Sequence, residues 1–123
     1  MNSLTITLPL PAKELSPNAR VHWAVKDRAT KAARTTACAV VWEQIGIRNK
    51  PLWEKATLQP TFYYKTSAWH DDDNSISSIK AYRDGIADAK VVGNDKDLKT
   101  VDCKILKDKD RPRIEIIITK VAK

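Results

Sequence analysis

Hydrophobic and polar positions alternate at the start of the chain. Between residues 4 and 10 every second residue is Leu or Ile, and the residues between them are Thr or Pro. This period of two predicts a β-strand with one buried face, and the prolines at 9 and 11 end it. Residues 13–23 show no clear period and predict a loop. Between Asp27 and Ile45 there is no Pro or Gly, apolar residues recur at helical spacing, and Gly46 follows, so we predict a first helix there.

The second half of the chain predicts one further helix and three strands. Residues 56–65 are rich in Thr, Phe and Tyr and predict a strand, which Pro60 places at a sheet edge or at a bulge. An acidic start near Asp71 opens a second helical pattern, which runs to about Val92. Residues 101–105 and 114–118 then alternate about a turn at 108–110, which predicts a final hairpin. The expected fold is α+β, in the order β-α-β-α-β-β, with a mixed four-stranded sheet and two helices.

Composition narrows the class of protein. A chain of 123 residues that is 42% hydrophobic and 30% charged is expected to form one globular domain over residues 1–123, neither disordered nor fibrous. Its net charge of +7 favours a polyanionic partner, with nucleic acid ahead of an anionic membrane surface. No apolar run approaches the roughly 20 residues of a membrane span, and the first residues lack a signal-peptide pattern, so we expect a cytoplasmic protein without a membrane partner. Cys38 and Cys103 lie far apart and are expected to be reduced and buried.

Acidic residues nevertheless cluster around the second predicted helix. Three consecutive aspartates occupy positions 71–73, and Asp95 and Asp97 follow the helix. One carboxylate is enough to cap a helix, whereas three neighbouring carboxylates repel one another unless a divalent cation lies among them. Both interpretations stay open at this point. Oxygen donors from Asp71, Asp73 and Asp95 suit Mg²⁺, which binds through a few carboxylates and substrate phosphate.

Helical geometry adds a lysine to this region. At about 100° per residue, Lys80 and Asp84 lie within about 20° on either side of Asp73, on one polar face of the predicted helix. Lys80 then has two roles open to it: it stabilises charge on a phosphate, or it is a solvated partner of Asp84 at i,i+4 spacing.

Basic residues gather at the first predicted helix. A group of cations between positions 20 and 34 fits binding to DNA phosphates, and it equally fits a charged solvent-facing surface. Its members are Arg20, Lys26, Arg28, Lys31 and Arg34. Trp23 and Trp69 flank the loops expected to face DNA, and their role stays open.

Three blocks, in this order, resemble the RusA-type Holliday junction resolvases, small endonucleases common in prophages. Residues 8–23 are similar to the proline-rich N-terminal loop of that family, and Asp71-x-Asp73-Asn74 is similar to its D-x-D-N core. The third block, Lys80-Ala81-x-x-Asp84-x-Ile86-x-x-Ala89 followed by residues 92–95, is similar to its helix and acidic turn.

The resemblance implies a homodimer in which each subunit has one Mg²⁺-dependent site that nicks a four-way DNA junction symmetrically. It places the catalytic, metal-binding carboxylates on Asp71, Asp73 and Asp95 and the essential lysine on Lys80, and it adds Asn18 to the DNA-binding residues. Lys80 departs from the family pattern, since it follows Asp73 by seven residues instead of four. We therefore expect three extra residues, near 75–77, to lengthen the loop that enters the second helix.

Two other functions remain open from the sequence. One is a module that binds branched or duplex DNA without cutting it, with the aspartates acting only as helix caps. The other is a metal-dependent nuclease that acts on replication forks, flaps or RNA.

Overall fold

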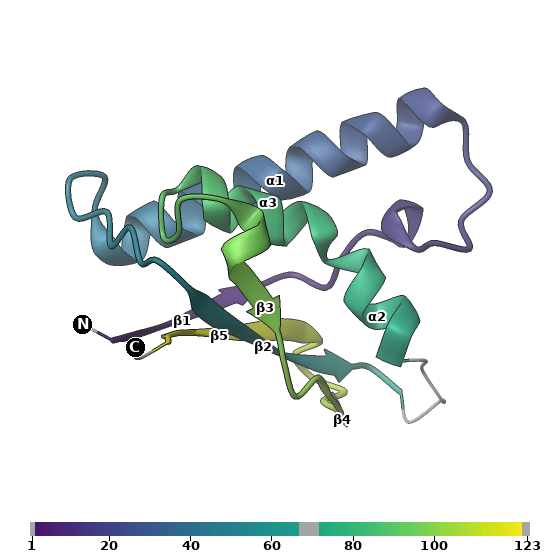
Figure 1. Ribbon diagram of the computed structural model, residues 1–123. Helices are drawn as coiled ribbons and strands as arrows, with labels where there is room; N and C mark the ends of the chain where they lie inside the picture. Colours follow the sequence, from purple (N-terminus) through teal and green to yellow (C-terminus); the bar gives the residue numbers. More distant parts are fainter. Residues whose placement is uncertain (1, 67–71, 122–123) are drawn as a thin grey trace.

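The structure, a computed structural model, describes residues 2–66 and 72–121, with the side chain of Asp72 excepted. It is an α+β fold in which helices pack on one face of a mixed, twisted sheet (Figure 1). The strands are β1 (Ser3–Leu8), β2 (Ala56–Tyr64), β3 (Leu98–Thr100), β4 (Lys104–Lys107) and β5 (Arg113–Lys120). The α-helices are α1 (Trp23–Ile45), α2 (Asp72–Ser78) and α3 (Lys80–Asp88), and two short 3₁₀ helices are η1 (Lys13–Leu15) and η2 (Asp95–Asp97).

In the described part of the chain the sheet has five strands, not the four that we predicted. The strand order is β1-β5-β2-β3, and β4 also pairs with β2. β5 is antiparallel to both of its neighbours, whereas β3 and β4 are parallel to β2. The predicted final hairpin is therefore wrong. The alternating isoleucines of β5 are completely buried, and the strands that pair with β5 are β1 and β2, not β4.

Pro60 lies in a central strand, and the gap between β3 and β4 accommodates it. The carbonyl of Leu58 accepts the Val101 N–H at 2.9 Å and so faces the β3–β4 side of the sheet. Since residues two apart in a strand direct their backbone polar groups to the same side, the nitrogen of Pro60 also faces that side, where it has no hydrogen to donate. Asp102, which has a φ of 45°, lies in the gap that separates β3 from β4. The sheet thus breaks on the side where proline cannot pair.

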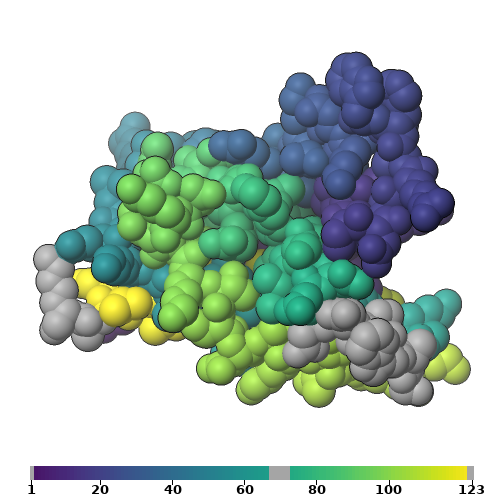
Figure 2. Space-filling model, turned by 45° about the vertical axis from the view of Figure 1, so that its right-hand side comes forward, coloured from purple at the N-terminus to yellow at the C-terminus, as the bar shows by residue number. Residues whose placement is uncertain are grey.

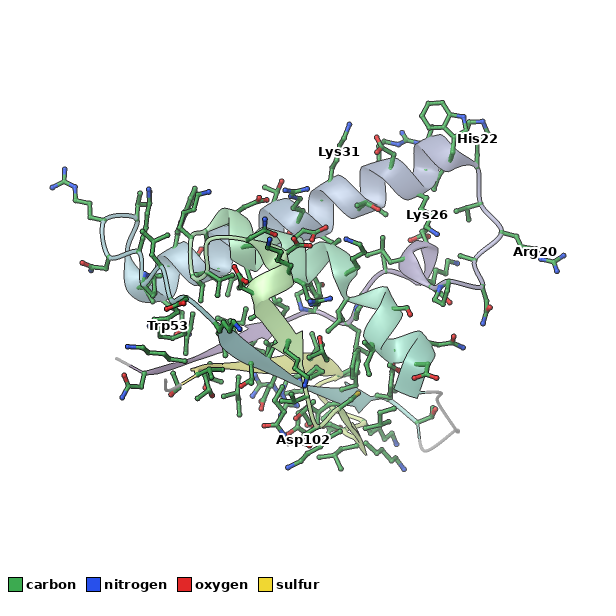
Figure 3. All side chains as sticks on the ribbon, viewed as in Figure 1. Arg20, His22, Lys26, Lys31, Trp53 and Asp102 are labelled. Carbon is green, nitrogen blue, oxygen red and sulfur yellow. The ribbon has the colours of Figure 1, made fainter. Side chains whose placement is uncertain are left out.

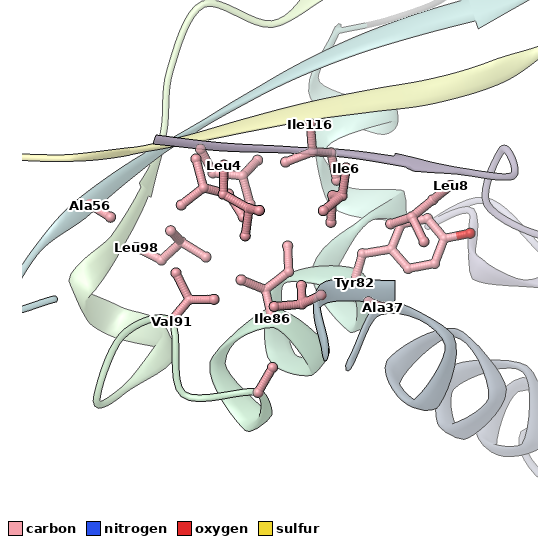
Figure 4. Close-up of a cluster of buried hydrophobic side chains, with 14 of the residues drawn as sticks. Leu4, Ile6, Leu8, Ala37, Ala56, Tyr82, Ile86, Val91, Leu98 and Ile116 are labelled. Carbon is pink, nitrogen blue, oxygen red and sulfur yellow. The ribbon is translucent and has the colours of Figure 1, made fainter. Parts of the chain in front are cut away.

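The core lies between the sheet and the helices (Figure 4). Leu4, Ile6 and Leu8 point from β1 into this layer, as the period of two predicts, and the strand residues that alternate with them, Ser3, Thr5 and Thr7, are exposed. Ile86 of α3 and Ala37 of α1 meet them from the helical layer. Burial of a Leu or Ile side chain stabilises the fold by about 1.5–3 kcal/mol.

The first predicted helix is confirmed, but it begins four residues earlier, at Trp23. His22 caps it, because its Nδ1 accepts the Ala24 N–H at 3.1 Å. Gly46 ends it, as predicted, with a φ of 80°.

The second predicted helix is not continuous. It breaks at Ile79 into α2 and α3 and ends at Asp88, before the expected Val92. Val92 instead forms a parallel bridge with Trp53, and the Trp53 N–H donates to the Val91 carbonyl at 2.8 Å. The break lets the two segments take different directions, so that α3 packs on α1 while α2 lies at the end of β2 (Figure 1).

Two further sequence predictions concern the cysteines and the membrane. Cys38 and Cys103 are free, as predicted, but they are half-buried, not fully buried. Partial burial raises the pKa of the Cys38 thiol, which favours its protonated form. Among the described residues there is no helix with the length and apolar character needed to cross a membrane.

Candidate functional site

A row of charged residues follows one face of α3. Lys80, Asp84 and Asp88 are spaced by four residues, whereas Tyr82, Gly85 and Ile86 are buried on the other side. Nζ of Lys80 lies 3.3 Å from Oδ2 of Asp84, so the i,i+4 pair expected from helical geometry is present. The lysine side chain is 71% exposed and the aspartate side chain is 19% exposed. The carboxylate is therefore held by the fold, and the ammonium group faces solvent.

Gly85 determines how close this charged row lies to α1. A Cβ at this position would lie 2.2 Å from the backbone oxygen of Arg34 and 2.9 Å from Cβ of Ala37. Only glycine permits this approach, because the nearest atom belongs to backbone. The contact brings Arg34 of α1 next to Asp88 of α3, one turn beyond Asp84.

Arg34 and Asp88 form a two-pronged ion pair between the helices. Nε and Nη2 of Arg34 donate to the two carboxylate oxygens, and the second hydrogen bond measures 2.7 Å. The hydrogen bond from Arg34 lowers the pKa of Asp88, and the same bond raises the pKa of the guanidinium. Both groups are therefore charged at neutral pH. The pair connects α1 and α3 next to Lys80 and Asp84.

Asp95 reaches this region from the turn after α3. It is half-buried and is the first residue of η2. Asn94 caps η2, because the Oδ1 of Asn94 accepts the Lys96 N–H at 3.2 Å. Nη2 of Arg83 in α3 donates to the Leu98 carbonyl at 2.6 Å. This bond ties the end of η2 to α3, so Asp95 has a defined position relative to Lys80.

These groups surround a depression of about 340 Å³, which we call the polar hollow. Its walls come from α1, α3 and the turn that leads to η2, and they contain both cations and carboxylates. The lining residues are Arg34, Lys80, Asp84, Ala87, Asp88, Lys90, Gly93, Asn94 and Asp95.

A second depression, also of about 340 Å³, lies on the other side of the Lys80–Asp84 pair; we call it the loop hollow. Lys80 and Asp84 line both hollows, so the pair separates them. The other walls of the loop hollow come from the η1 loop, the first part of α1 and the α2–α3 junction. Its remaining lining residues are Leu15, Pro17, Lys26, Thr30, Ser77, Ser78 and Ala81.

The predicted carboxylates do not all meet at the polar hollow. Asp73 is exposed in the first turn of α2 and lines neither hollow, and Figure 1 shows that turn well apart from the segment that contains η2. Asp71 lies outside the described residues. Within the described part of the chain, no three His, Cys, Asp or Glu side chains are arranged to hold a metal ion.

The three residues suggested as an insertion, 75–77, are helical, so our expectation of a longer loop is wrong. Ser75 is buried, and its Oγ lies 2.8 Å from the hydroxyl of Tyr64 at the end of β2. This contact packs α2 against the sheet. Residues 75–77 thus belong to the helical segment in front of Lys80.

The predicted DNA-binding residues lie along the loop before α1 and along α1 itself. Figure 3 shows Arg20 and Lys31 directed away from the sheet, with Lys26 below the helix. All six predicted residues are exposed: Asn18, Arg20, Lys26, Arg28, Lys31 and Arg34. Two of them have carboxylate partners, since Lys31 pairs with Asp27 at 3.0 Å and Arg34 pairs with Asp88.

Sequence reasoning missed three of the polar side chains that line the polar hollow: Asp88, Lys90 and Asn94. Asp88 carried a usable signal, because it continues the i,i+4 row that begins at Lys80 and Asp84. Lys90 has a φ of 68°, and no local pattern predicts that a lysine takes this left-handed conformation.

Comparison with known proteins identifies a relative that is similar to this chain over nearly its whole length. No protein-family profile matches the chain. Over 119 residues the chain is 39% identical to an uncharacterized protein of Xylella fastidiosa (strain Temecula1 / ATCC 700964), and the match covers 94% of this chain and 74% of that protein. Identity of this level over nearly the whole chain shows common descent. The chain belongs to the same family as this Xylella fastidiosa protein.

Proposed function

We propose that the protein is a Mg²⁺-dependent, structure-selective endodeoxyribonuclease that resolves four-way DNA junctions by paired symmetric nicks. In this proposal it acts as a homodimer, so that two equivalent sites meet two equivalent strands of the junction. The observation that carries the proposal is the polar hollow, where Lys80 and Asp95 come together from separate parts of the chain beside the basic helix α1.

Lys80 supplies the phosphate-binding group. The Lys80 ammonium group is mostly exposed, so a phosphodiester oxygen can approach it from solvent. The 3.3 Å ion pair with Asp84 can stay in place as it does so. Asp84 keeps the lysine between the two hollows. A cation held in advance at this position stabilises negative charge as it develops on the phosphate.

Basic residues of α1 provide the wider attraction for DNA. Each phosphate that a lysine or arginine neutralises releases a counterion, so affinity falls steeply as salt concentration rises. The exposed Lys26 lines the loop hollow and Arg34 lines the polar hollow. A DNA strand that passes Lys80 therefore meets cations on both sides of it.

The described residues of one chain do not by themselves supply a complete set of ligands for Mg²⁺. Carboxylate oxygens are the donors that Mg²⁺ prefers, and Asp95 brings one such group to the polar hollow. Asp73 lies outside the hollow, and Asp71 is outside the described residues. The carboxylates that the proposal assigns to the ion are those of Asp71, Asp73 and Asp95.

The separation of Asp73 from Asp95 favours a second candidate, a module that binds branched or duplex DNA without cutting it. In that case Asp73 acts as a carboxylate in the first turn of α2, where it favours the helix electrostatically. Lys80 and the cations of α1 then hold DNA phosphates only. Such a module requires no divalent ion.

A cleavage assay separates the two candidates. The full chain is incubated with a labelled four-way junction that has a mobile branch point, and with a matched linear duplex, in Mg²⁺ or in EDTA. Paired symmetric nicks that require Mg²⁺ and occur only in the junction support the resolvase. Binding without cleavage supports the binding module, and cleavage of forks, flaps or RNA in place of junctions assigns a different nuclease substrate.

Matched variants test the polar hollow itself. We expect Lys80→Met to slow cleavage by about 100-fold, the cost of losing one group that stabilises developing charge. Lys96→Met removes a lysine of η2 that does not line the hollow, and it serves as the control. Asp95→Asn is compared with Asp97→Asn in the same way. Equal effects of a variant and its control would reject the assignment of the hollow.

A further inference from the structure

The first half of α1 extends beyond the rest of the protein. The fully buried residues of this helix are Ala37, Val41 and Ile45, so the stretch from Trp23 to Thr36 has no fully buried side chain, although Ala33 packs partly buried against the core. In Figure 2 the dark blue start of α1 stands out from the body of the molecule. Helices in proteins gain most of their stability from a packed face. This half of α1 therefore has surface available for an external partner.

Trp23 is the most exposed large hydrophobic side chain at this end. It is 74% exposed, and its neighbours Val21 and Val25 are 41% and 36% exposed. The ring of His22 lies beside the indole, with a centroid separation of 5.5 Å and a tilt of 34°. A tryptophan in this position offers a wide aromatic surface to a ligand.

The charges around Trp23 select the kind of partner. Residues 20–31 contain four cations and one carboxylate, so their net charge is 4 − 1 = +3. The one carboxylate, Asp27, is already paired with Lys31. A second copy docked here by two-fold symmetry would bring the same cations face to face, which is unfavourable. A polyanion that carries flat aromatic groups is complementary to both the charge and the indole.

The position of Trp23 on α1 connects it with the two hollows. At about 100° per residue, Thr30 and Arg34 lie within about 20° of Trp23 around the helix, and Lys26 lies within about 60°. Lys26 and Thr30 line the loop hollow, and Arg34 lines the polar hollow. Trp23 thus stands at the outer end of a row of residues that leads to Lys80.

We propose that Trp23 is a stacking platform for an unpaired base of the bound nucleic acid, whose phosphates follow Lys26 and the neighbouring cations. The proposal rests on the function proposed above in one respect, that the nucleic acid is branched DNA. Aromatic stacking beside a basic track is the usual way in which proteins hold unpaired bases, and it requires no particular base sequence.

The test uses the full chain and a four-way junction that carries 2-aminopurine at the branch point. Stacking on an indole quenches the fluorescence of this base, so the wild-type protein is expected to quench it. Trp23→Ala should abolish the quenching and weaken junction binding by about tenfold. Trp23→Phe should keep most of both, and Leu52→Ala, which removes another side chain that is 58% exposed, should change neither.

Binding to a fully paired linear duplex is measured in parallel. We expect Trp23→Ala to leave it unchanged within about twofold, because a paired duplex offers no free base to the indole. Equal losses on duplex and junction would overturn the proposal. Conversion of a wild-type dimer to a monomer by Trp23→Ala, measured by sedimentation, would overturn it in favour of an interface between copies of the chain.

A single-stranded oligonucleotide labelled with 2-aminopurine separates this inference from the resolvase proposal. Trp23-dependent quenching on the single strand, without junction preference or cleavage, would retain the stacking platform and reject the resolvase. Junction cleavage that is unaffected by Trp23→Ala, with quenching unchanged, would retain the resolvase and reject the platform. Absence of binding to every nucleic acid would reject both.

Discussion

Replacing Gly85 by alanine tests the close contact between α1 and α3. The added Cβ would lie 2.2 Å from the Arg34 backbone oxygen, whereas ordinary van der Waals contact begins at 3.4 Å. The helices must therefore separate locally by about 3.4 − 2.2 = 1.2 Å. Because the Arg34–Asp88 ion pair joins the same two helices, this shift also disturbs one wall of the polar hollow.

The magnitude follows from two opposing effects. Alanine is favoured over glycine inside a helix by about 1 kcal/mol. Overpacking costs about 1–3 kcal/mol, and a clash with backbone lies at the upper end, since no side chain can rotate away. The expected net loss in the free energy of unfolding is thus about 2 kcal/mol. For a chain of this size the melting temperature should fall by about 8 °C.

Urea unfolding followed by far-UV circular dichroism measures this loss, with Gly93→Ala as the control. A Cβ at Gly93 meets no atom within 4 Å, so its substitution should change the free energy of unfolding by no more than about 0.5 kcal/mol. If Gly85→Ala proves as stable as the wild type, the helices are not held as close as described. If Gly85→Ala is as stable as the wild type but no longer binds the junction, a shift of the two helices does not explain the loss of binding.

Three further predictions concern the ion pair, a buried tyrosine and the metal. The hydrogen bond from Arg34 lowers the pKa of Asp88 in the folded chain. The ionised carboxylate therefore stabilises the fold at pH values above its unfolded pKa of about 3.9, and this stabilisation is lost as the pH falls through the pKa of the folded chain. Arg34→Gln should raise that pKa, seen by NMR titration, and reduce the acid sensitivity of urea unfolding. Burial raises the pKa of Tyr82 to about 12, so ultraviolet absorbance should show a late tyrosine titration that Tyr82→Phe removes. Tyr82→Phe should also cost about 1 kcal/mol, because it loses a hydrogen bond to the backbone after β1. EDTA should abolish junction cleavage but leave binding intact, and so should Asp73→Asn, while Asp110→Asn, in the turn before β5, should change neither.

Elements defined by their own periodicity could be predicted from the sequence. The alternation at residues 4–8 predicted both the strand β1 and its buried face, and helical spacing predicted most of α1. The start of α1 was placed late because its cap is a histidine, whereas Ser, Thr, Asp and Asn are the usual N-cap residues.

Strand pairing could not be predicted in the same way. Alternation shows which face of a strand is buried, but it does not name the neighbouring strand. The isoleucines at 114–118 are equally compatible with a hairpin to residues 101–105 and with a place between β1 and β2. Pro60 was predicted to lie at a sheet edge or at a bulge, but β2 lies inside the sheet, and the proline is accommodated by the gap between β3 and β4 on one side of it.

In the candidate site, too, contacts within one helix could be predicted from the sequence, whereas contacts between distant segments could not. The Lys80–Asp84 pair lies within one helix, so helical geometry was sufficient to predict it. The Arg34–Asp88 pair depends on the close contact at Gly85, which joins residues more than fifty positions apart. Asp73 and Asp95 were grouped because they flank the second predicted helix and because of the resemblance, and the break at Ile79 adds a change of direction between them that no helical period encodes.

The order of the strands has a consequence for how the chain acquires its structure during synthesis. β5 is the last of the described strands, yet it lies between β1 and β2 and provides all of the antiparallel pairing among these strands. Until residues 113–120 have left the ribosome, β1 has no partner and both β1 and β2 present free edges. Such edges invite pairing with other chains. The sheet therefore closes only after β5 has been synthesised, and a nascent chain that stalls before Arg113 should be a substrate for chaperones.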